Sequence, residues 1–191
     1  NRLSIIDLTN LGSQPMFSDE NSTSILFNGE IFNHKELRAE MESEGLVFKS
    51  NNSDTEVLLL GFSKYGKDFV NRVIGQFSIV FFDYKKNLIF LIRDRLGQKP
   101  LFYSFQDESL VFGSNLKSIV NLTNNRKINQ NSVSEYLNIG VVTSPNTIFE
   151  NIYKVKPAEI IELHISNIIS KKSSEVYWNI EDFVDNKEFD E

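Results

Sequence analysis

The chain has 191 residues, of which 40% are hydrophobic and 24% charged, and a formal net charge of −6. This length suffices to bury the core of one domain, while the negative charge argues against nucleic acids and anionic membranes as partners. The apolar runs are far shorter than the ~20 residues of a membrane-spanning helix, and no signal or transit segment is visible, so we expect a cytoplasmic protein. The absence of cysteine excludes disulfides, thiolate metal ligands and a thiol nucleophile within these residues.

Two strands and then two helices are predicted in the first third of the chain. The strands are Arg2–Leu8 and Thr23–Phe27. The segment NHKELRAEMESEG follows as an amphipathic helix, with Asn33 as its N-cap and Gly45 at its end. A second helix begins at SDTE, where Ser53 and the glutamate three residues later have the spacing of a capping box.

The rest of the chain is dominated by predicted strands. The runs FSIVFFDY and NLIFLI are almost continuously apolar, which is typical of strands covered on both faces. The short polar stretch DYKKN between them predicts an antiparallel hairpin. We therefore expect two stacked sheets with helices outside. These two apolar runs lie in the predicted strands Gln76–Tyr84 and Asn87–Arg93. The further candidates are strands Leu101–Phe105, Leu110–Phe112, Glu159–His164 and Ile168–Lys172, and a helix at SVSEYLNIG.

The stretch FNGEIFNH raises a question of function, because Asn28 and Gly29 interrupt an apolar strand. The Asn28 amide and a backbone N–H near Gly29 are two donors that could stabilise an oxyanion, and glycine lets a ligand approach the main chain closely. Asn-Gly is also the strongest short turn signal. From these residues alone the turn is the favoured interpretation, and both stay open.

Three charged residues form a second candidate group. Arg2 offers a planar guanidinium for a carboxylate, and Glu30 and Asp54 offer carboxylates for an ammonium group. Together they would suit an amino acid zwitterion. The alternative is that Arg2 is a surface charge and that Asp54 is placed at a helix start by the helix dipole.

Two other features carry weaker signals. The turn IRDRLGQKP contains Arg93, Asp94 and Arg95, and we expect these charges to shape the turn rather than to act in function. His34 and His164 have no second histidine and no cysteine near them in the sequence, so we expect no metal site.

Seven motifs occur in order along the chain: RLSIID, NGEIFNH, SDTEVLL, GQFSIVFFD, RDRLGQKPLFY, EYLNIG and PNTIFENIYKVKPAE. Together they resemble the glutamine-hydrolysing domain of class II glutamine amidotransferases, in its asparagine synthetase branch. The resemblance covers nearly the whole chain, and the order of the motifs argues against coincidence. It reverses the preference for the turn and the surface charges.

The resemblance implies an N-terminal nucleophile hydrolase fold. This is an α+β fold, a four-layer αββα sandwich of two stacked, mainly antiparallel sheets, here without its N-terminal strands. In such enzymes the thiol of an N-terminal cysteine attacks the carboxamide of glutamine, with its own α-amine as general base. A thioester forms, ammonia leaves, and water releases glutamate. The ammonia passes to a synthetase domain that uses ATP to amidate an acceptor carboxylate, such as that of aspartate.

The same resemblance implies roles for particular residues. Asn28 and Gly29 match the oxyanion pair, and Arg2 matches the arginine that holds the substrate α-carboxylate. Glu30 and Asp54 match the groups around the substrate α-ammonium. The main chain of four further residues would line the same pocket, namely Leu3, Ser4, Ile5 and Ile6.

Departures from the family pattern shape the expected organisation. The Met-Cys-Gly start and the ATP-binding Ser-Gly-Gly-x-Asp-Ser loop are absent. We expect residues 1–180 to be a glutaminase domain that lacks its N-terminal segment and nucleophile, and residues 181–191 to be a linker toward a synthetase domain. Asn115 stands where many relatives have glutamate.

The expected partners are L-glutamine and the synthetase domain of the same chain, and a homodimer is left open. We expect no cofactor in this domain, with ATP and magnesium used by the synthetase domain. Two alternatives are kept. One is an amidotransferase of the same branch that modifies a sugar or a peptide, and the other is a non-catalytic glutamine-binding module.

Overall fold

The structure, a computed structural model, describes residues 13–106, 109–167 and 172–183. The predicted strand Arg2–Leu8 and most of Ile168–Lys172 lie outside these residues. Within them, the chain forms a six-stranded sheet of order β1-β2-β3-β4-β8-β9 and a three-stranded sheet of order β6-β5-β7. All the neighbouring strands pair antiparallel, as predicted. The strands are β1 Met16–Phe17, β2 Thr23–Ile31, β3 Gly75–Asp83, β4 Leu88–Arg93, β5 Phe102–Gln106, β6 Ser109–Gly113, β7 Ile152–Lys154, β8 Glu159–His164 and β9 Lys172–Val176.

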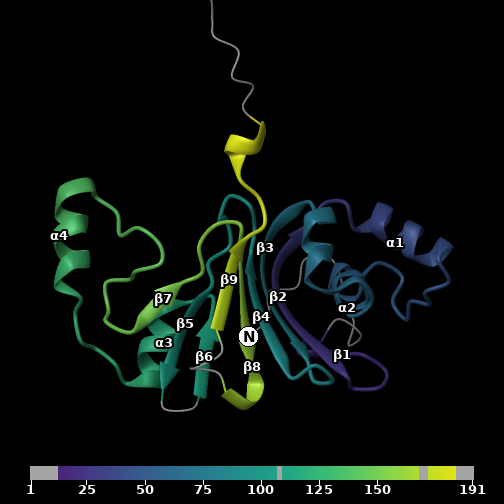
Figure 1. The fold of residues 1–191 in the computed structure, drawn as a ribbon, viewed down its shortest axis with the longest axis horizontal. Helices are drawn as coiled ribbons and strands as arrows, with labels where there is room; N and C mark the ends of the chain where they lie inside the picture. The colour runs from purple at the N-terminus through teal and green to yellow at the C-terminus, as the bar shows by residue number, and fades with distance from the viewer. Residues whose placement is uncertain (1–12, 107–108, 168–171, 184–191) are drawn as a thin grey trace, which may run out of the picture.

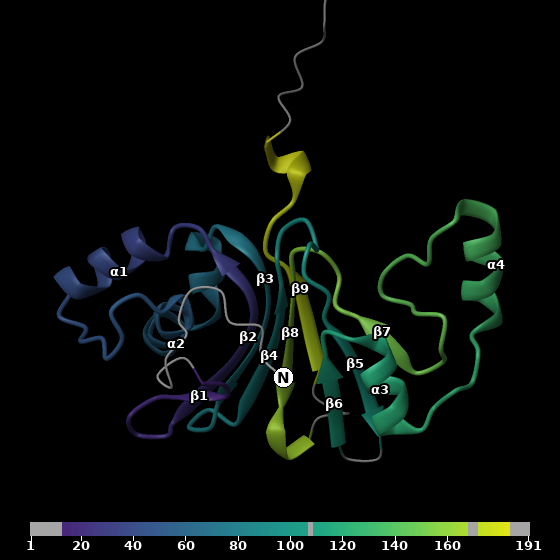
Figure 2. The ribbon, with the colours of Figure 1, turned by 180° about the vertical axis from the view of Figure 1, so that it is seen from behind.

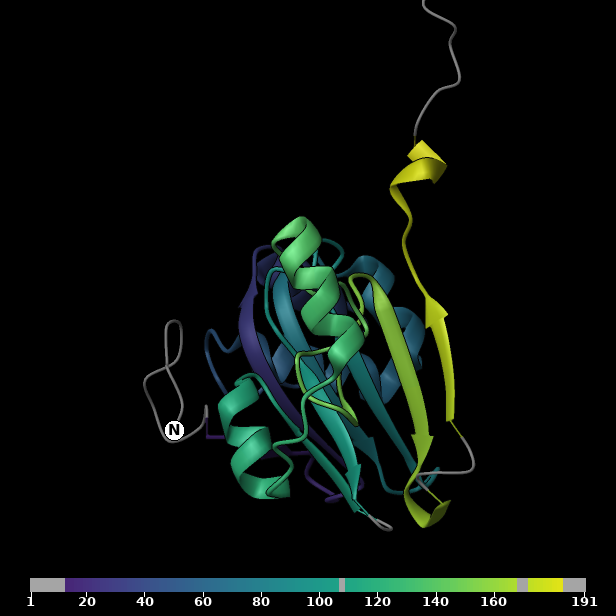
Figure 3. The same ribbon diagram turned by 90° about the vertical axis from the view of Figure 1, so that its left-hand side faces the viewer.

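The helices complete the four layers that the family resemblance implies. Helices α1 (His34–Ser43) and α2 (Asp54–Tyr65) cover one face of the large sheet, and the small sheet lies against its other face (Figures 1 and 2). Helices α3 (Leu116–Thr123) and α4 (Gln130–Ile139) lie beyond the small sheet, on its side away from the large one (Figure 3). The described part of the chain is therefore an αββα sandwich.

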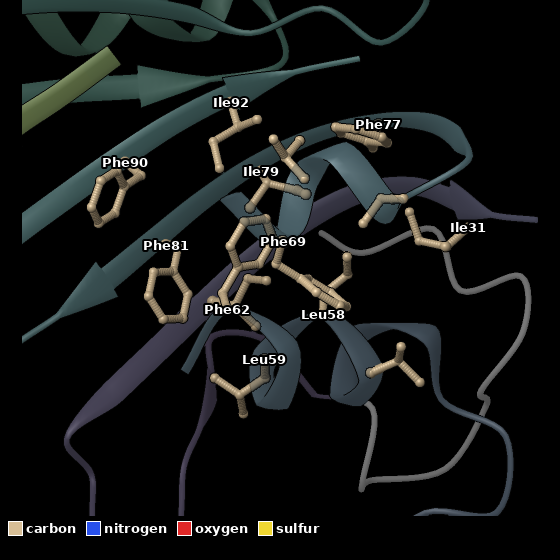
Figure 4. Packing of buried hydrophobic residues seen from close by; sticks show 14 of the residues in the cluster. Ile31, Leu58, Leu59, Phe62, Phe69, Phe77, Ile79, Phe81, Phe90 and Ile92 are labelled. Atoms are coloured by element: carbon tan, nitrogen blue, oxygen red, sulfur yellow. The ribbon is translucent and has the colours of Figure 1, made fainter. Parts of the chain in front are cut away.

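Each interface between layers has its own apolar cluster. The largest lies between α2 and the large sheet, where the ring of Phe62 packs 5.5 Å from that of Phe69 and 5.4 Å from that of Phe81 (Figure 4). A second cluster fills the space between the two sheets, and a third lies under α3. Strands β3 and β4 contribute to the first two clusters, which explains why their sequences are apolar on both faces.

Strand β2 is longer than predicted. The sequence pattern places its end at Phe27, yet the strand continues through Ile31, and Asn28 pairs with Ser78 of β3. Asn28 and Gly29 are therefore strand residues, and the turn interpretation is wrong. The hairpin of β3 and β4 is confirmed, with the N–H of Lys86 donating to Asp83 Oδ1 at 2.9 Å in its turn.

The helix ends follow the sequence signals only in part. Ser53 caps α2 by accepting the N–H of Glu56 at 3.3 Å. Asn33 occupies the N-cap position of α1 without capping it, because its side-chain amide is used elsewhere: Nδ2 donates to the carbonyl of Arg72 and Oδ1 accepts the N–H of Ile74, both at 2.9 Å. The polar side chain next to a helix start thus links α1 to the chain that enters β3.

Helices α3 and α4 are both capped by asparagine. The sequence pattern does not predict α3, and Asn115 is its N-cap, with Oδ1 accepting the N–H of Lys117 at 2.9 Å and that of Ser118 at 3.3 Å. The pattern predicts a serine at the start of α4, but its N-cap is Asn129. The predicted end at Gly140 is confirmed, where the backbone adopts a left-handed conformation with φ 76°.

The loop that leads from β4 of the large sheet to β5 of the small sheet is built around Asp94. Its carboxylate is fully buried, and it accepts four backbone N–H groups, from Phe77, Leu96, Gln98 and Lys99. The Arg93 guanidinium instead donates to three carbonyl oxygens, those of Gly97, Lys99 and Val155. The prediction that these charges shape the turn is confirmed for Arg93 and Asp94, whereas the Arg95 guanidinium donates to the carbonyl of Asn71, outside the turn.

Candidate functional site

The described residues of the predicted site gather at the end of β2. Asn28, Gly29 and Glu30 follow one another on this strand. Asp54 is the first residue of α2, and its Oδ2 accepts the N–H of Ile31 at 3.4 Å. The remaining predicted residues, Arg2 and 3–6, lie outside the part of the chain that the structure describes.

The hydrogen bonds around β2 show which way its backbone groups point. The N–H and the carbonyl of Phe77, the partner of Gly29, both bond to Asp94 on the β4 side of β3. In an antiparallel ladder the two groups of one residue point the same way, and successive residues alternate. Phe77 therefore does not use its backbone groups to bind β2, and the N–H of Gly29 points away from β3, to the outer edge of β2.

The neighbouring N–H groups on that edge have their own acceptors. The N–H of Phe27 donates to Gln14 Oε1 at 2.7 Å, and that of Ile31 donates to Asp54. The pairing of β1 with β2 involves Ser24 and Ile25 and stops short of this position. The N–H of Gly29 lies between two occupied donors, at a part of the edge that β1 does not cover.

Gly29 is required by the close approach of β2 and β3. Its φ of +152° is one that residues with a side chain rarely adopt. A Cβ at this position would lie 2.0 Å from the carbonyl oxygen of Gln76 and 2.8 Å from the Cα of Phe77. No side chain fits there, so only glycine allows the backbones of β2 and β3 to approach this closely.

The Asn28 side chain lines a cavity of about 220 Å³ between the two sheets. Because side chains alternate along a strand, Glu30 projects to the same face of β2 as Asn28. Ser78, the cross-strand partner of Asn28, lines the same cavity. The other lining residues are Gln14, Leu26, Phe27, Val80, Leu101, Phe112, Gly113 and Ser114. An amide N–H and a backbone N–H are thus available at one strand end, beside a largely apolar hollow.

Burial dominates the electrostatics of Asp54, whose side chain is only slightly exposed. Desolvation raises the pKa of its carboxyl, and the N–H groups of Ile31 and Thr55 and the charge of His34 lower it in part. His34 is itself held at the strand end, since its Nδ1 donates to the carbonyl of Ile31 at 2.8 Å. The carboxylate is therefore fixed in place and costly to ionise.

Two residues of this site escaped prediction from the sequence. Gln14 is held to Phe27 by a bond between residues 13 positions apart, and no local pattern indicates it. Ser78 interrupts the apolar run FSIVFF, which is a weak signal that becomes meaningful only once its partner across the strands is known to be Asn28.

A larger cavity, with a volume of about 460 Å³, lies elsewhere, between the β1–β2 loop and α2. Its buried carboxylate, Glu56, already accepts the N–H groups of Lys49 and Ser50. That carboxylate is engaged in holding the loop before α2, so we place the functional site at the smaller cavity beside Asn28.

Two other kinds of site are absent from the described residues. No helix there has the length and apolar character needed to cross a membrane. Residues 13–106, 109–167 and 172–183 also contain no group of three or more His, Asp or Glu side chains that could hold a metal ion.

The chain is similar to known proteins along nearly its whole length. The chain is 35% identical over 189 residues to asparagine synthetase [glutamine-hydrolyzing] 2 of Bacillus subtilis (strain 168), a match that covers 96% of this chain and 24% of the relative. It is 34% identical to asparagine synthetase [glutamine-hydrolyzing] 3 of the same organism, covering 100% of this chain and 31% of the relative. The chain thus spans about a quarter to a third of the length of these relatives.

The fold is shared with a solved structure of glutamine phosphoribosylpyrophosphate amidotransferase from B. subtilis. The TM-score is 0.64 at 16% sequence identity, over 90% of this chain and 33% of that one. The family model of the glutamine amidotransferase domain matches residues 1–178. This chain therefore belongs to the glutamine amidotransferase domain family, with asparagine synthetases among its relatives.

Proposed function

We propose that this domain hydrolyses glutamine to glutamate and ammonia within a glutamine-dependent asparagine synthetase. The observation that carries the proposal is the pair of donors at Asn28 and Gly29. The N–H of Gly29 points to an edge of β2 that β1 leaves uncovered, and the Asn28 amide lines the adjacent cavity. A carboxamide oxygen at this strand end would accept from both donors, and would do so most strongly once it carries the negative charge of a tetrahedral intermediate.

The substrate α-ammonium would be bound beside this pair. Glu30 follows Gly29 on β2, and Asp54 is anchored to the N–H of Ile31. Two carboxylates near one strand end suit a cation that carries several N–H donors. Arg2 would hold the α-carboxylate, and the main chain of residues 3–6 would line the pocket.

The chain contains no cysteine, so the proposed nucleophile is a cysteine of the longer enzyme. Its thiolate would attack the carboxamide carbon, and the carbonyl π-electrons would move to the oxygen held by Asn28 and Gly29. Collapse of this intermediate breaks the C–N bond, and the nitrogen leaves as ammonia after gaining a proton. Water then attacks the thioester, which releases glutamate and restores the thiol.

The organisation of the enzyme belongs to the same proposal. Residues 1–180 would form the glutaminase domain, which works without a cofactor, and residues 181–191 would lead to a synthetase domain that uses ATP and magnesium to amidate aspartate. We place the enzyme in the cytoplasm. The resemblance leaves open whether the enzyme forms a homodimer. Sedimentation would reveal a homodimer by a mass twice that of one chain.

The proposal is tested with the full-length enzyme. Given glutamine, ATP, magnesium and aspartate, it should form glutamate and asparagine, and ammonia should replace glutamine as nitrogen donor. The 191-residue chain alone should release no glutamate above background, because it has no thiol. Glutamate release without asparagine would indicate another acceptor, such as a sugar or a peptide. Tight glutamine binding without any release would support a non-catalytic binding module and overturn the proposal.

A further inference from the structure

We propose that His34 is a positioning residue that makes this site selective for a substrate with an α-ammonium group. The inference rests on the function proposed above. His34 would act through Asp54, because it holds the end of β2 to the segment that leads into α2 and so fixes the carboxylate where the ammonium binds. The imidazole itself would not touch the substrate.

The first support is a ring of hydrogen bonds at the strand end. His34 is the first residue of α1, and its Nδ1 donates to the carbonyl of Ile31 at 2.8 Å. The N–H of the same Ile31 donates to Asp54 Oδ2 at 3.4 Å. The imidazole Nε2 forms a hydrogen bond of 3.0 Å with Oδ1 of Asn52, two residues before Asp54. Both ring nitrogens are therefore engaged, and they join β2 to the start of α2.

The second support is the burial of the two side chains. His34 is 8% exposed and Asp54 is 6% exposed. Burial raises the pKa of the Asp54 carboxyl, and the nearby charge of His34 lowers it in part. The imidazole thus lies close enough to Asp54 to act on it directly, as well as through Ile31.

The bond between Ile31 and Asp54 is long enough to need this support. Its length of 3.4 Å exceeds the range of about 2.7–3.2 Å that is usual for N–H···O bonds, so by itself it restrains the carboxylate weakly. His34 holds Ile31 from its carbonyl side. Without the imidazole, the strand end and Asp54 could move apart, and the contact with the ammonium would weaken in the bound substrate and in the transition state alike.

Neighbouring polar side chains serve other contacts. Asn33 is tied to the segment that enters β3, and Ser53 caps α2. His34 is buried, and its two bonds reach both the strand end and the residues before Asp54. It is therefore the side chain best placed to set the position of this carboxylate.

The test compares two substrates of the full-length enzyme, glutamine and glutaramate, the analogue of glutamine that lacks the α-amino group. Ammonia release is measured without ATP, so that the ammonia accumulates. His34→Ala should raise KM for glutamine about three- to tenfold, the value of one ordinary hydrogen bond, with little change in kcat. For glutaramate, which has no ammonium to bind, kcat/KM should stay at the wild-type value. Because KM does not depend on the fraction of active enzyme, partial unfolding alone would not produce this pattern.

Three further variants sharpen the test. His34→Asn keeps a donor that can reach the carbonyl of Ile31, and should regain part of the lost affinity for glutamine. His164→Ala is the matched control at the other histidine of the chain, on β8, and should leave both substrates unaffected. In an Asp54→Asn enzyme, whose ammonium contact is already weakened, adding His34→Ala should raise KM for glutamine no further.

The inference and the proposed function fail in different ways. An unchanged KM for glutamine in His34→Ala, or an equal loss of kcat/KM with both substrates, would overturn the inference and leave glutamine hydrolysis intact. Losses of His34→Ala and Asp54→Asn that multiply would do the same. A wild-type enzyme that releases no ammonia from glutamine would overturn both.

Discussion

At the residue scale, Asn28 differs from an ordinary strand asparagine in its surroundings. It stands next to a glycine whose N–H faces an edge that β1 does not cover, and its amide lines a cavity between the sheets. An asparagine that only completed a strand would need neither feature. The functional role and the structural role therefore make different predictions for one substitution.

Asn28→Ala should lower kcat for glutamine hydrolysis about 10²–10³-fold, with a smaller change in KM, because one donor to the oxyanion is lost. Synthesis from free ammonia should persist, since that reaction takes place in the synthetase domain. Measuring both activities and the Tm of the variant separates the two roles. If both activities and the Tm fell together, Asn28 would be a structural residue, and a normal kcat in a stable variant would remove it from the mechanism.

Asp54 acts at the same scale through its charge. Because burial raises the pKa of its carboxyl, the ionised form that binds an ammonium is lost as the pH falls through this raised value. KM for glutamine should therefore begin to rise at a higher pH than for an ordinary aspartate. Asp54→Asn should have a raised KM for glutamine already at neutral pH, and this KM should not increase further as the pH falls. Its kcat should change little. An unchanged KM would return Asp54 to the role of a helix-start residue.

The raised pKa of Asp54 also predicts how Asp54→Asn changes the stability of the folded protein with pH. A raised pKa in the folded protein means that folding favours the protonated carboxyl, so its contribution is fully present below the unfolded pKa and is lost as the pH rises through the folded one. In Asp54→Asn, the amide oxygen of the new side chain can still accept the N–H of Ile31. Denaturant titrations at several pH values should therefore show Asp54→Asn gaining stability over the wild type as the pH rises. A stability difference that stays constant across these pH values would contradict the raised pKa.

At the element scale, the pairing of β2 with β3 depends on a glycine. Gly29→Ala should lower the free energy of unfolding by about 3 kcal/mol or more, because the new Cβ would overlap the backbone of β3. Gly45→Ala is the matched control. Gly45 also has a positive φ, of +88°, but a Cβ there meets nothing within 4 Å, so only backbone strain of about 1 kcal/mol is expected. If urea denaturation showed equal losses of unfolding free energy for Gly29→Ala and Gly45→Ala, this would argue against the close approach of β2 and β3.

The secondary-structure elements also show where local sequence patterns predict the structure correctly and where they fail. Leu37 and Met41, four residues apart, are both buried under α1, as their helical spacing indicates. The same reasoning ends β2 at Phe27, because polar residues and glycine usually close a strand. It fails there because β3 continues alongside and supplies partners for Asn28 and Glu30.

At the scale of the whole molecule, the two sheets are joined through the loop around Asp94. Asp94→Ala should lower the free energy of unfolding by about 3 kcal/mol or more, since it leaves four buried or half-buried N–H groups without their acceptor. Asp83→Ala is the matched control, because Asp83 accepts a single loop N–H, that of Lys86, and about 1 kcal/mol is expected. In urea denaturation, a loss of unfolding free energy in Asp94→Ala no larger than that in Asp83→Ala would contradict this role.

The sequence by itself determined the local features of this protein. Runs that are apolar on both faces indicated the doubly covered strands β3 and β4, and Ser53 and Gly140 marked helix ends. The composition excluded a thiol within the chain, and the order of the motifs indicated the family. These features depend on residues close together in the chain, where spacing and side-chain type suffice.

Only the tertiary structure decided what surrounds the Asn28–Gly29 pair. The direction of the Gly29 N–H follows from the bonds between Phe77 and Asp94, and the place of Ser78 follows from the register of β2 against β3. Both depend on contacts between residues about 17 and 50 positions apart, which no local period encodes. A single-residue slip of that register would turn Asn28 and Ser78 to opposite faces, which is why the site belongs to the assembled sheet.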